Sequence, residues 1–252
     1  MLPVRYFASD SGLHGSDELL FLAAAGAKSP ILMSRFTHIS LENKLISIFP
    51  ILGRWKDRRI LAHRLDKWCR DGWSLPLPCV LKRAIIKAKA RKMGAEIFVE
   101  TGTYRGDTVW FFRNDFRSIF TIEVQPNLAR LAAERFAGYP HITVVEGDSA
   151  DKLAEVIPRI TGPCLFWLDG HYSAGITGKG ASDCPIWGEL DAIIGHLGHP
   201  FGLLIDDARC FDGTGGYPPI DELRKHLAER LPGHGWAVEN DIIRVMPAAS
   251  AK

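Results

Sequence analysis

Three aspartates in this sequence each follow a short apolar run, which is where a buried strand would leave the core. Asp169 ends CLFWLD, and Asp206 and Asp207 end GLLIDD. If these runs form neighbouring strands of a parallel sheet, their carboxyl ends bring three like charges together. Mg²⁺ takes oxygen ligands and would relieve this repulsion, so the sequence predicts a metal site at the three aspartates. The alternative is that Asp206 and Asp207 only cap the following turn.

An imidazole lies two residues after Asp169. His171 would titrate near neutral pH, so it is a candidate general base that takes a proton from an acceptor hydroxyl. Two other roles stay open for His171: contact with substrate or with a ligating carboxylate, or a purely structural bond to backbone. Asp169 as the base, or an acceptor hydroxyl activated by the metal alone, is a further alternative.

A second group of candidate residues lies in the run FVETGTYRGDTVWFF. Gly102 and Gly106 fall there between a predicted strand and a predicted helix, where glycine permits positive φ and close approach of the backbone to a ligand. The glycine spacing differs from the GxGxxG of dinucleotide-binding proteins. Glu100 at the strand end would repel a pyrophosphate and attract a cationic amino group. The plain alternative is an ordinary strand-to-helix turn.

The same run resembles a known motif. Residues 100–108, ETGTYRGDT, look like the first motif of class I S-adenosylmethionine-dependent methyltransferases. They are especially similar to the ExGxYxG[YST] variant found in metal-dependent O-methyltransferases of the catechol type. The resemblance implies S-adenosylmethionine as cofactor, bound in part by the following residues of this turn: Glu100, Gly102, Thr103, Tyr104 and Gly106.

Two later segments strengthen the resemblance. TIEVQPN resembles the family's stretch after the second strand, and Glu123 lies 21 residues after Gly102, where a carboxylate that binds ribose hydroxyls is expected. EGDSA matches the family's adenine-contacting position, which implies that Asp148 accepts from the adenine amino group and Ser149 bonds a ring nitrogen. Asp169 is expected to contact the cofactor as well. The alternatives are an exposed acid at Glu123 and a helix-capping Gly-Asp-Ser turn at 147–149.

The chain also departs from the family's pattern. Catechol-type enzymes match it at Asp169 and Asp206 but carry asparagine where Asp207 stands. The arrangement of one aspartate plus an aspartate pair is closer to the metal-dependent sugar O-methyltransferases of macrolide and aminocoumarin pathways. The catechol type also has a catalytic lysine three residues after its first metal aspartate, and this chain has Tyr172 there. The lysine base is therefore not carried over, and the resemblance covers only about residues 95–247.

The order of predicted elements suits such a fold. From residue 95, short continuous apolar runs alternate with amphipathic segments, which predicts parallel strands with helices on both faces. GWAVEN and DIIRVMP predict the last two strands. The sequence thus predicts a doubly wound, mostly parallel, seven-stranded Rossmann-like α/β sheet in a methyltransferase domain over 94–252, with ligands at the carboxyl ends of the strands. Residues 1–93 are predicted to form a helical N-terminal extension that covers it.

The overall composition is that of an ordinary globular protein. The 252 residues are 46% hydrophobic and 24% charged, with a net charge of +2. This balance gives no reason to expect nucleic acid, and the basic residues of 82–92 are expected on a solvated helix face. Five scattered cysteines without a CxxC pair favour reduced thiols and a cytoplasmic location. The apolar run at 19–27 is too short to span a bilayer.

We therefore expect an S-adenosylmethionine-dependent methyltransferase that carries out divalent-metal-dependent O-methylation of a hydroxyl on a sugar or small metabolite. The expected partner is a small-molecule or glycan acceptor, without nucleic acid or a membrane span, and a homodimer through the helical front half is left open. Alternatives are a metal-independent N- or O-methyltransferase that uses His171, and a non-catalytic methyltransferase-like binding module. Lys179 is expected in solvent, with contact to an anionic substrate as the alternative. Glu189 is expected on a helix surface, with an orientation towards the site as the alternative.

Overall fold

A computed structural model describes residues 63, 65–72, 75–169 and 184–248. The chain divides into two compact units, Met1–Ser74 and Leu75–Lys252. The second unit contains the sheet and also helix α5 (Cys79–Met93). Most of the predicted helical extension lies outside the described residues, as do His171, Tyr172 and Lys179. Among the described helices, none is long and apolar enough to cross a membrane.

The described part of the second unit is built on a seven-stranded sheet with the strand order β3-β2-β1-β4-β5-β7-β6. Strands β1 to β5 pair in parallel, whereas β7 is antiparallel to both β5 and β6. This confirms the predicted doubly wound, mostly parallel sheet. The strands are β1 (Ile97–Thr101), β2 (Ser118–Glu123), β3 (Ile142–Glu146), β4 (Cys164–Leu168), β5 (Phe201–Ile205), β6 (His234–Glu239) and β7 (Ile242–Pro247).

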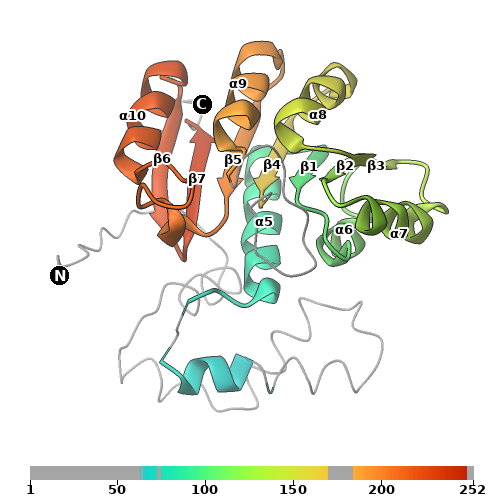
Figure 1. Ribbon diagram of the computed structural model, residues 1–252, viewed down its shortest axis with the longest axis horizontal. Coiled ribbons are helices and arrows are strands. Elements are labelled where there is room, and N and C mark those ends of the chain that lie inside the picture. Colours follow the sequence, from blue (N-terminus) through green and yellow to red (C-terminus); the bar gives the residue numbers. More distant parts are fainter. Residues whose placement is uncertain (1–62, 64, 73–74, 170–183, 249–252) are drawn as a thin grey trace. The chain divides into compact units, whose positions relative to one another are not determined.

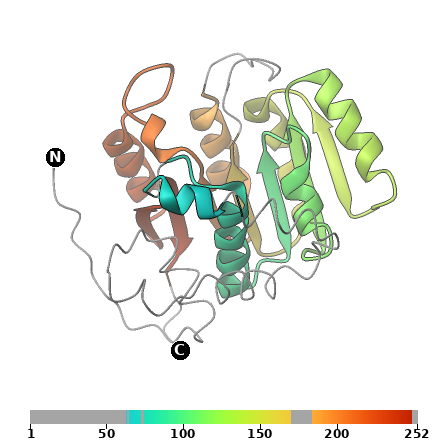
Figure 2. The same ribbon diagram turned by 90° about the horizontal axis from the view of Figure 1, so that it is seen from below.

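Helices cover both faces of this sheet (Figure 1). Helices α8, α9 and α10 lie on one face and α5, α6 and α7 on the other, and Figure 2 shows the same layers from below. The bounds are α6 (Asp107–Phe112), α7 (Pro126–Phe136), α8 (Ser149–Val156), α9 (Ile186–His196) and α10 (Ile220–Arg230), with short 3₁₀ turns η1 (Ile157–Arg159) and η2 (Ala208–Cys210).

The continuous apolar runs of the sequence are the central strands. Every residue of β1, β4 and β5 is buried, as expected for strands with helices on both sides. Alternate side chains of β1 point to opposite faces of the sheet. Ile97 and Val99 pack in the core between the sheet and helices α8, α9 and α10. Phe98 points to the other layer and lies 5.2 Å, centroid to centroid, from both Phe112 and Phe116. The sheet thus has one core on each face.

Helix α5 leads directly into β1. It buries Ile85, Ile86 and Ala90 and ends at Gly94, whose left-handed conformation lets its N–H bond the carbonyls of the last turn. Because β1 follows after only a few residues, the beginning of α5 lies towards the carboxyl ends of the parallel strands. This places the first turns of a basic helix at the edge where ligands bind in such sheets.

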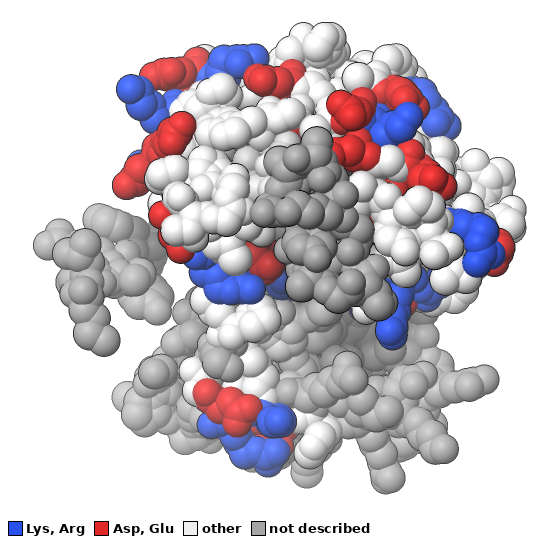
Figure 3. Space-filling view, viewed as in Figure 1, with Lys and Arg blue, Asp and Glu red and all other residues white. Residues whose placement is uncertain are grey.

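Charges of both signs are interspersed over the described surface on the face drawn in Figure 3. Several basic side chains of α5 have partners within the unit, and Lys87 is an example: its Nζ bonds both Asp115 carboxylate oxygens, at 2.7 and 3.0 Å. Such pairing leaves less of the helix's positive charge for an external polyanion.

Candidate functional site

The turn after β1 has the backbone conformation that its glycines indicate. Gly102, Tyr104 and Gly106 all have positive φ, at 83°, 49° and 72°. A Cβ at Gly106 would stand 2.8 Å from Cε2 of Phe136 in α7, so glycine is needed there for close approach as well as for φ. Gly102 N donates to Ile122 O at 2.9 Å, which holds the turn against β2. The turn is therefore tightly packed against its neighbours, although its tip, Tyr104, is exposed.

Glu123 is fixed beside this turn at the end of β2. Its Oε2 accepts from Tyr104 N at 2.7 Å and its Oε1 accepts from Gln125 N at 3.0 Å. The Gln125 side chain in turn caps α7 by accepting from Leu128 N. The residue is 5% exposed, so the alternative of an exposed strand-end acid is wrong. Two charge-assisted bonds hold the carboxylate in one orientation.

Glu100 lies in the interior at the end of β1, 2% exposed. Its Oε2 accepts from Thr121 Oγ1 at 2.9 Å, and the Thr121 and Thr103 hydroxyl oxygens are 2.5 Å apart. Burial raises the pKa of Glu100 to about 8, although the Thr121 bond and the nearby Arg83 charge oppose the shift. A cationic group of a ligand beside Glu100 would favour its ionised form.

Asp148 and Ser149 stand at the start of α8, and each has a partner within the protein. Asp148 Oδ1 accepts from Ala150 N at 3.0 Å, which is the helix-capping bond that the sequence left open as an alternative. Ser149 is buried, and its hydroxyl donates to Glu189 Oε1 at 2.6 Å. The predicted contacts of both residues with adenine stay predictions.

The expectation that Glu189 lies on a helix surface is wrong. The side chain is 1% exposed and faces the sheet from α9. Gly188 explains this depth, because a Cβ there would meet Ala150 Cβ at 2.6 Å, so α8 and α9 are in close contact at that point. Burial raises the pKa of Glu189 to about 7, against the hydrogen bonds from Ser149 and Thr101. An orientation of Glu189 towards the site was only the alternative in the sequence, since an acid in a helix is usually solvated.

Asp169, Asp206 and Asp207 come together as predicted. Asp206 N donates to Leu168 O at 3.0 Å, which extends the β4–β5 pairing past the last strand residues. Each carboxylate offers an oxygen, and these oxygens all lie within 4.8 Å of one another. Burial, and then the charge of Asp206, raises the pKa of Asp169. Burial also raises the pKa of Asp206, against the opposing effect of Lys82. The three residues are called the aspartate cluster below.

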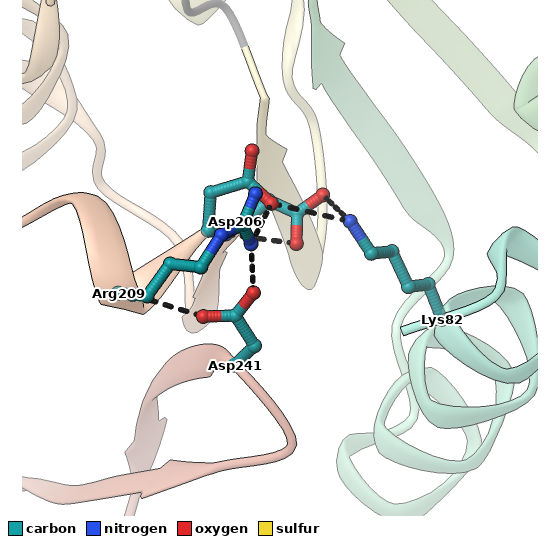
Figure 4. Close-up of polar contacts among 5 residues, drawn as sticks. Lys82, Asp206, Arg209 and Asp241 are labelled. Carbon is teal, nitrogen blue, oxygen red and sulfur yellow. Dashed lines mark hydrogen bonds and ion pairs between the residues drawn. The ribbon is translucent and has the colours of Figure 1, made fainter. Parts of the chain in front are cut away.

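Lys82 of α5 reaches the aspartate cluster from one side (Figure 4). Its Nζ donates to Asp206 Oδ2 and lies 3.4 Å from Asp207 Oδ1. Only 13% of the Lys82 side chain is exposed, so the expectation of a solvated basic face is wrong for this residue. Burial lowers the pKa of Lys82, but the charges of Asp206, Asp169 and Asp207 outweigh that effect and the net shift is upward. The neighbouring carboxylates therefore favour the charged form of Lys82.

A second cation approaches from the opposite side (Figure 4). Arg209 Nη1 donates to Asp207 Oδ1 at 2.9 Å and also to the Asp241 carboxylate, while Arg209 N donates to Asp241 Oδ1 at 2.9 Å. Asp241 comes from the turn between β6 and β7, where it and Asn240 both have positive φ. Asp207 itself has φ 53°, a conformation that aspartate tolerates better than most residues.

The structure therefore brings the candidates into two groups at the carboxyl ends of the strands. Glu100, Glu123 and the glycine turn gather at β1 and β2, and the aspartate cluster at β4 and β5. Sequence reasoning missed Lys82, Arg209 and Asp241, and it favoured a surface position for Glu189. The only available signal was the position of Lys82 in the first turns of a helix that directly precedes β1.

The sequence matches no family model and no curated protein. The fold does resemble solved structures. A provisionally named caffeoyl-CoA O-methyltransferase from Staphylococcus aureus is 14% identical with a TM-score of 0.52, over 82% of this chain and 99% of that one. A provisionally named O-methyltransferase from Klebsiella pneumoniae is 16% identical with a TM-score of 0.51, over 83% and 97% of the two chains.

A third structure, the O-methyltransferase from Bacillus cereus in complex with SAH, is 13% identical with a TM-score of 0.50 and covers 83% of this chain and 100% of that one. At such identities the likeness concerns the fold alone. The strand order, with β7 antiparallel between β5 and the edge strand β6, is that of the class I S-adenosylmethionine-dependent methyltransferases. This chain has that fold.

Proposed function

We propose that the protein is an S-adenosylmethionine-dependent O-methyltransferase that acts on a hydroxyl of a sugar or another small metabolite. The observation that carries the proposal is the fixed carboxylate of Glu123 beside the glycine turn, with the aspartate cluster two and three strands away in the same sheet. Glu123 and the glycine turn suit a nucleoside, and the aspartate cluster suits the reacting hydroxyl. Both lie where ligands bind in a doubly wound sheet.

The cofactor's groups would meet complementary residues. Glu123 has both carboxylate oxygens oriented by backbone N–H groups, and it is the proposed acceptor for the ribose hydroxyls. Glu100 is the proposed partner of the amino group, with Gly102, Thr103, Tyr104 and Gly106 as the turn that passes beside the cofactor. Asp148 and Ser149 are proposed at the adenine, and Asp169 near the methyl donor.

The reaction is a direct displacement at carbon. The acceptor oxygen forms a bond to the methyl carbon while the bond from that carbon to sulfur breaks, which releases S-adenosylhomocysteine. The hydroxyl proton passes to a base, for which His171 is the proposed residue and Asp169 the alternative. The protein's own contribution is to hold the two reactants in line and to receive that proton.

The aspartate cluster fits a divalent cation by its charge. Asp169, Asp206, Asp207 and Asp241 are opposed by the two cations Lys82 and Arg209, so two negative charges remain when all six side chains are ionised. Asp169, Asp206 and Asp207 are the proposed ligands of Mg²⁺, which prefers carboxylate oxygens. Such an ion would polarise an acceptor hydroxyl.

Calorimetry with S-adenosylhomocysteine tests the cofactor assignment. We expect binding to the native chain, and its absence at high micromolar ligand would refute the methyltransferase proposal and leave a binding module without cofactor. A second experiment tests whether turnover requires the metal. It measures methyl transfer from labelled S-adenosylmethionine to a panel of sugars and phenols, first with EDTA and then with restored Mg²⁺.

A metal-independent methyltransferase is the second candidate, and the contact of Lys82 with Asp206 favours it. An ammonium in the aspartate cluster supplies positive charge without any ion. Turnover that is indifferent to both EDTA and Mg²⁺ would support this candidate over the metal-dependent one.

A further inference from the structure

Lys82 contacts carboxylate oxygens of two residues that are proposed as metal ligands. Its ammonium donates to Oδ2 of Asp206 and lies 3.4 Å from Oδ1 of Asp207. These are two of the three proposed ligands, and they belong to strand-end residues whereas Lys82 belongs to α5. A lysine from a distant segment thus stands in the cation position.

Two oxygen atoms of these carboxylates also have a further or different donor within the protein. Asp206 Oδ1 already accepts from Asp207 N at 2.9 Å, and Asp207 Oδ1 already accepts from Arg209 Nη1 at 2.9 Å. An ion that used Asp206 Oδ2 would share this oxygen with the ammonium. Two positive centres on one oxygen stand only a few ångströms apart and repel strongly in a poorly solvated site.

We infer that Lys82 is the resident cation of the aspartate cluster and that a divalent ion binds only when the Lys82 ammonium leaves Asp206. The inference rests on the metal site of the proposed function and adds an internal competitor to it. The four-carbon stem of lysine makes such a movement feasible, since its ammonium is a point charge without the fixed geometry of arginine.

Titration of the protein with Mn²⁺, followed by calorimetry, tests the competition directly. Lys82→Met removes the charge, and we expect it to bind Mn²⁺ roughly tenfold or more tightly than the native chain does. Lys82→Arg keeps the charge and should bring no such gain. Lys87→Met is the matched control, because Lys87 lies on the same helix but pairs with Asp115. It should bind Mn²⁺ as the native chain does.

The loss of Lys82 leaves Asp206 without its ammonium and could impair folding. Lys82→Gln serves as the second variant, since its amide keeps a hydrogen-bond donor but carries no charge. Like Lys82→Met, this variant should bind Mn²⁺ more tightly than the native chain. Circular dichroism and S-adenosylhomocysteine binding verify that each variant is folded.

Two results would overturn the inference. One is unchanged or weaker Mn²⁺ binding in folded Lys82→Met and Lys82→Gln. The other is a lack of Mn²⁺ binding at millimolar concentrations in both the native chain and these variants, which would make Lys82 a permanent counter-ion. Failure of the proposed function itself looks different, because the native chain would then not bind S-adenosylhomocysteine.

Discussion

Lys82 of helix α5 donates a hydrogen bond to Asp206 at the end of β5, 124 residues later in the chain. This bond joins the helix that precedes the sheet to the carboxylates at the carboxyl ends of β4 and β5. It gives the aspartate cluster a positive charge from within the protein, and any account of metal binding or catalysis at this edge must include that charge.

Replacing the cluster's carboxylates should abolish stabilisation by metal. In the native chain we expect Mn²⁺ at a hundred times its dissociation constant to raise Tm by about 5–10 °C. Asp206→Asn/Asp207→Asn should lose this rise, because the ligands are gone, and differential scanning fluorimetry measures it. Asp212→Asn is the control, since Asp212 is an exposed carboxylate of the same loop that bonds Thr214. If Mn²⁺ raised the Tm of the double variant as much as that of the native chain, Asp206 and Asp207 would not be metal ligands.

Glu123 should determine much of the affinity for S-adenosylhomocysteine. We expect Glu123→Gln to weaken binding by about tenfold to a hundredfold, because bonds to a charged acceptor are lost. Glu146→Gln provides the control: Glu146 is the register partner of Glu123 on β3, but it is exposed. Calorimetry on both variants makes the comparison, and equal affinities would argue against ribose binding by Glu123.

Gly188 should be needed for the close packing of α8 against α9. Gly188→Ala would bring a Cβ to 2.6 Å from Ala150 Cβ. The helices would have to move apart, at a cost of about 1–3 kcal/mol in the free energy of unfolding. Gly195→Ala in the same helix has no neighbour within 4 Å and should be neutral or stabilising. Urea denaturation of both variants tests this, and equal loss of stability would contradict the packing argument.

Glu189 should make the stability fall as pH rises. Its pKa is about 7 in the folded chain, above the ordinary value of 4.5, so the folded state binds the extra proton between those pH values. The free energy of unfolding should therefore fall with pH in that window, by up to about 1.4 kcal/mol per pH unit from this group.

Glu189→Gln cannot lose a proton and should flatten the fall between pH 5 and pH 7, roughly the window that the folded pKa defines. Urea denaturation at several pH values measures the slope. Glu155→Gln serves as control, because the Glu155 side chain is 61% exposed. The same pH slope in Glu189→Gln and the native chain would show that Glu189 titrates normally.

The sequence by itself determined the sheet and most of the edge residues. Continuous apolar runs are a local property, and the runs predicted as strands from residue 95 onward form strands, as in β1, β4 and β5. Asp169, Asp206 and Asp207 follow such runs directly, so once the strands are parallel neighbours, the three carboxylates must meet. The position of Glu123 could also be predicted from the sequence, because its distance from Gly102 is set by one strand-helix-strand unit.

Only the tertiary structure decided which charges meet those residues. Lys82 looks like its basic neighbours in α5, and Glu189 looks like any helical acid. Their burial depends on how α5 and α9 pack on the sheet, through contacts between residues that are distant in the chain. Local patterns set which segments are strands and helices. The rotation of each helix against the sheet is set by packing, and it brought an ammonium to the aspartates and a carboxyl group beneath Ser149.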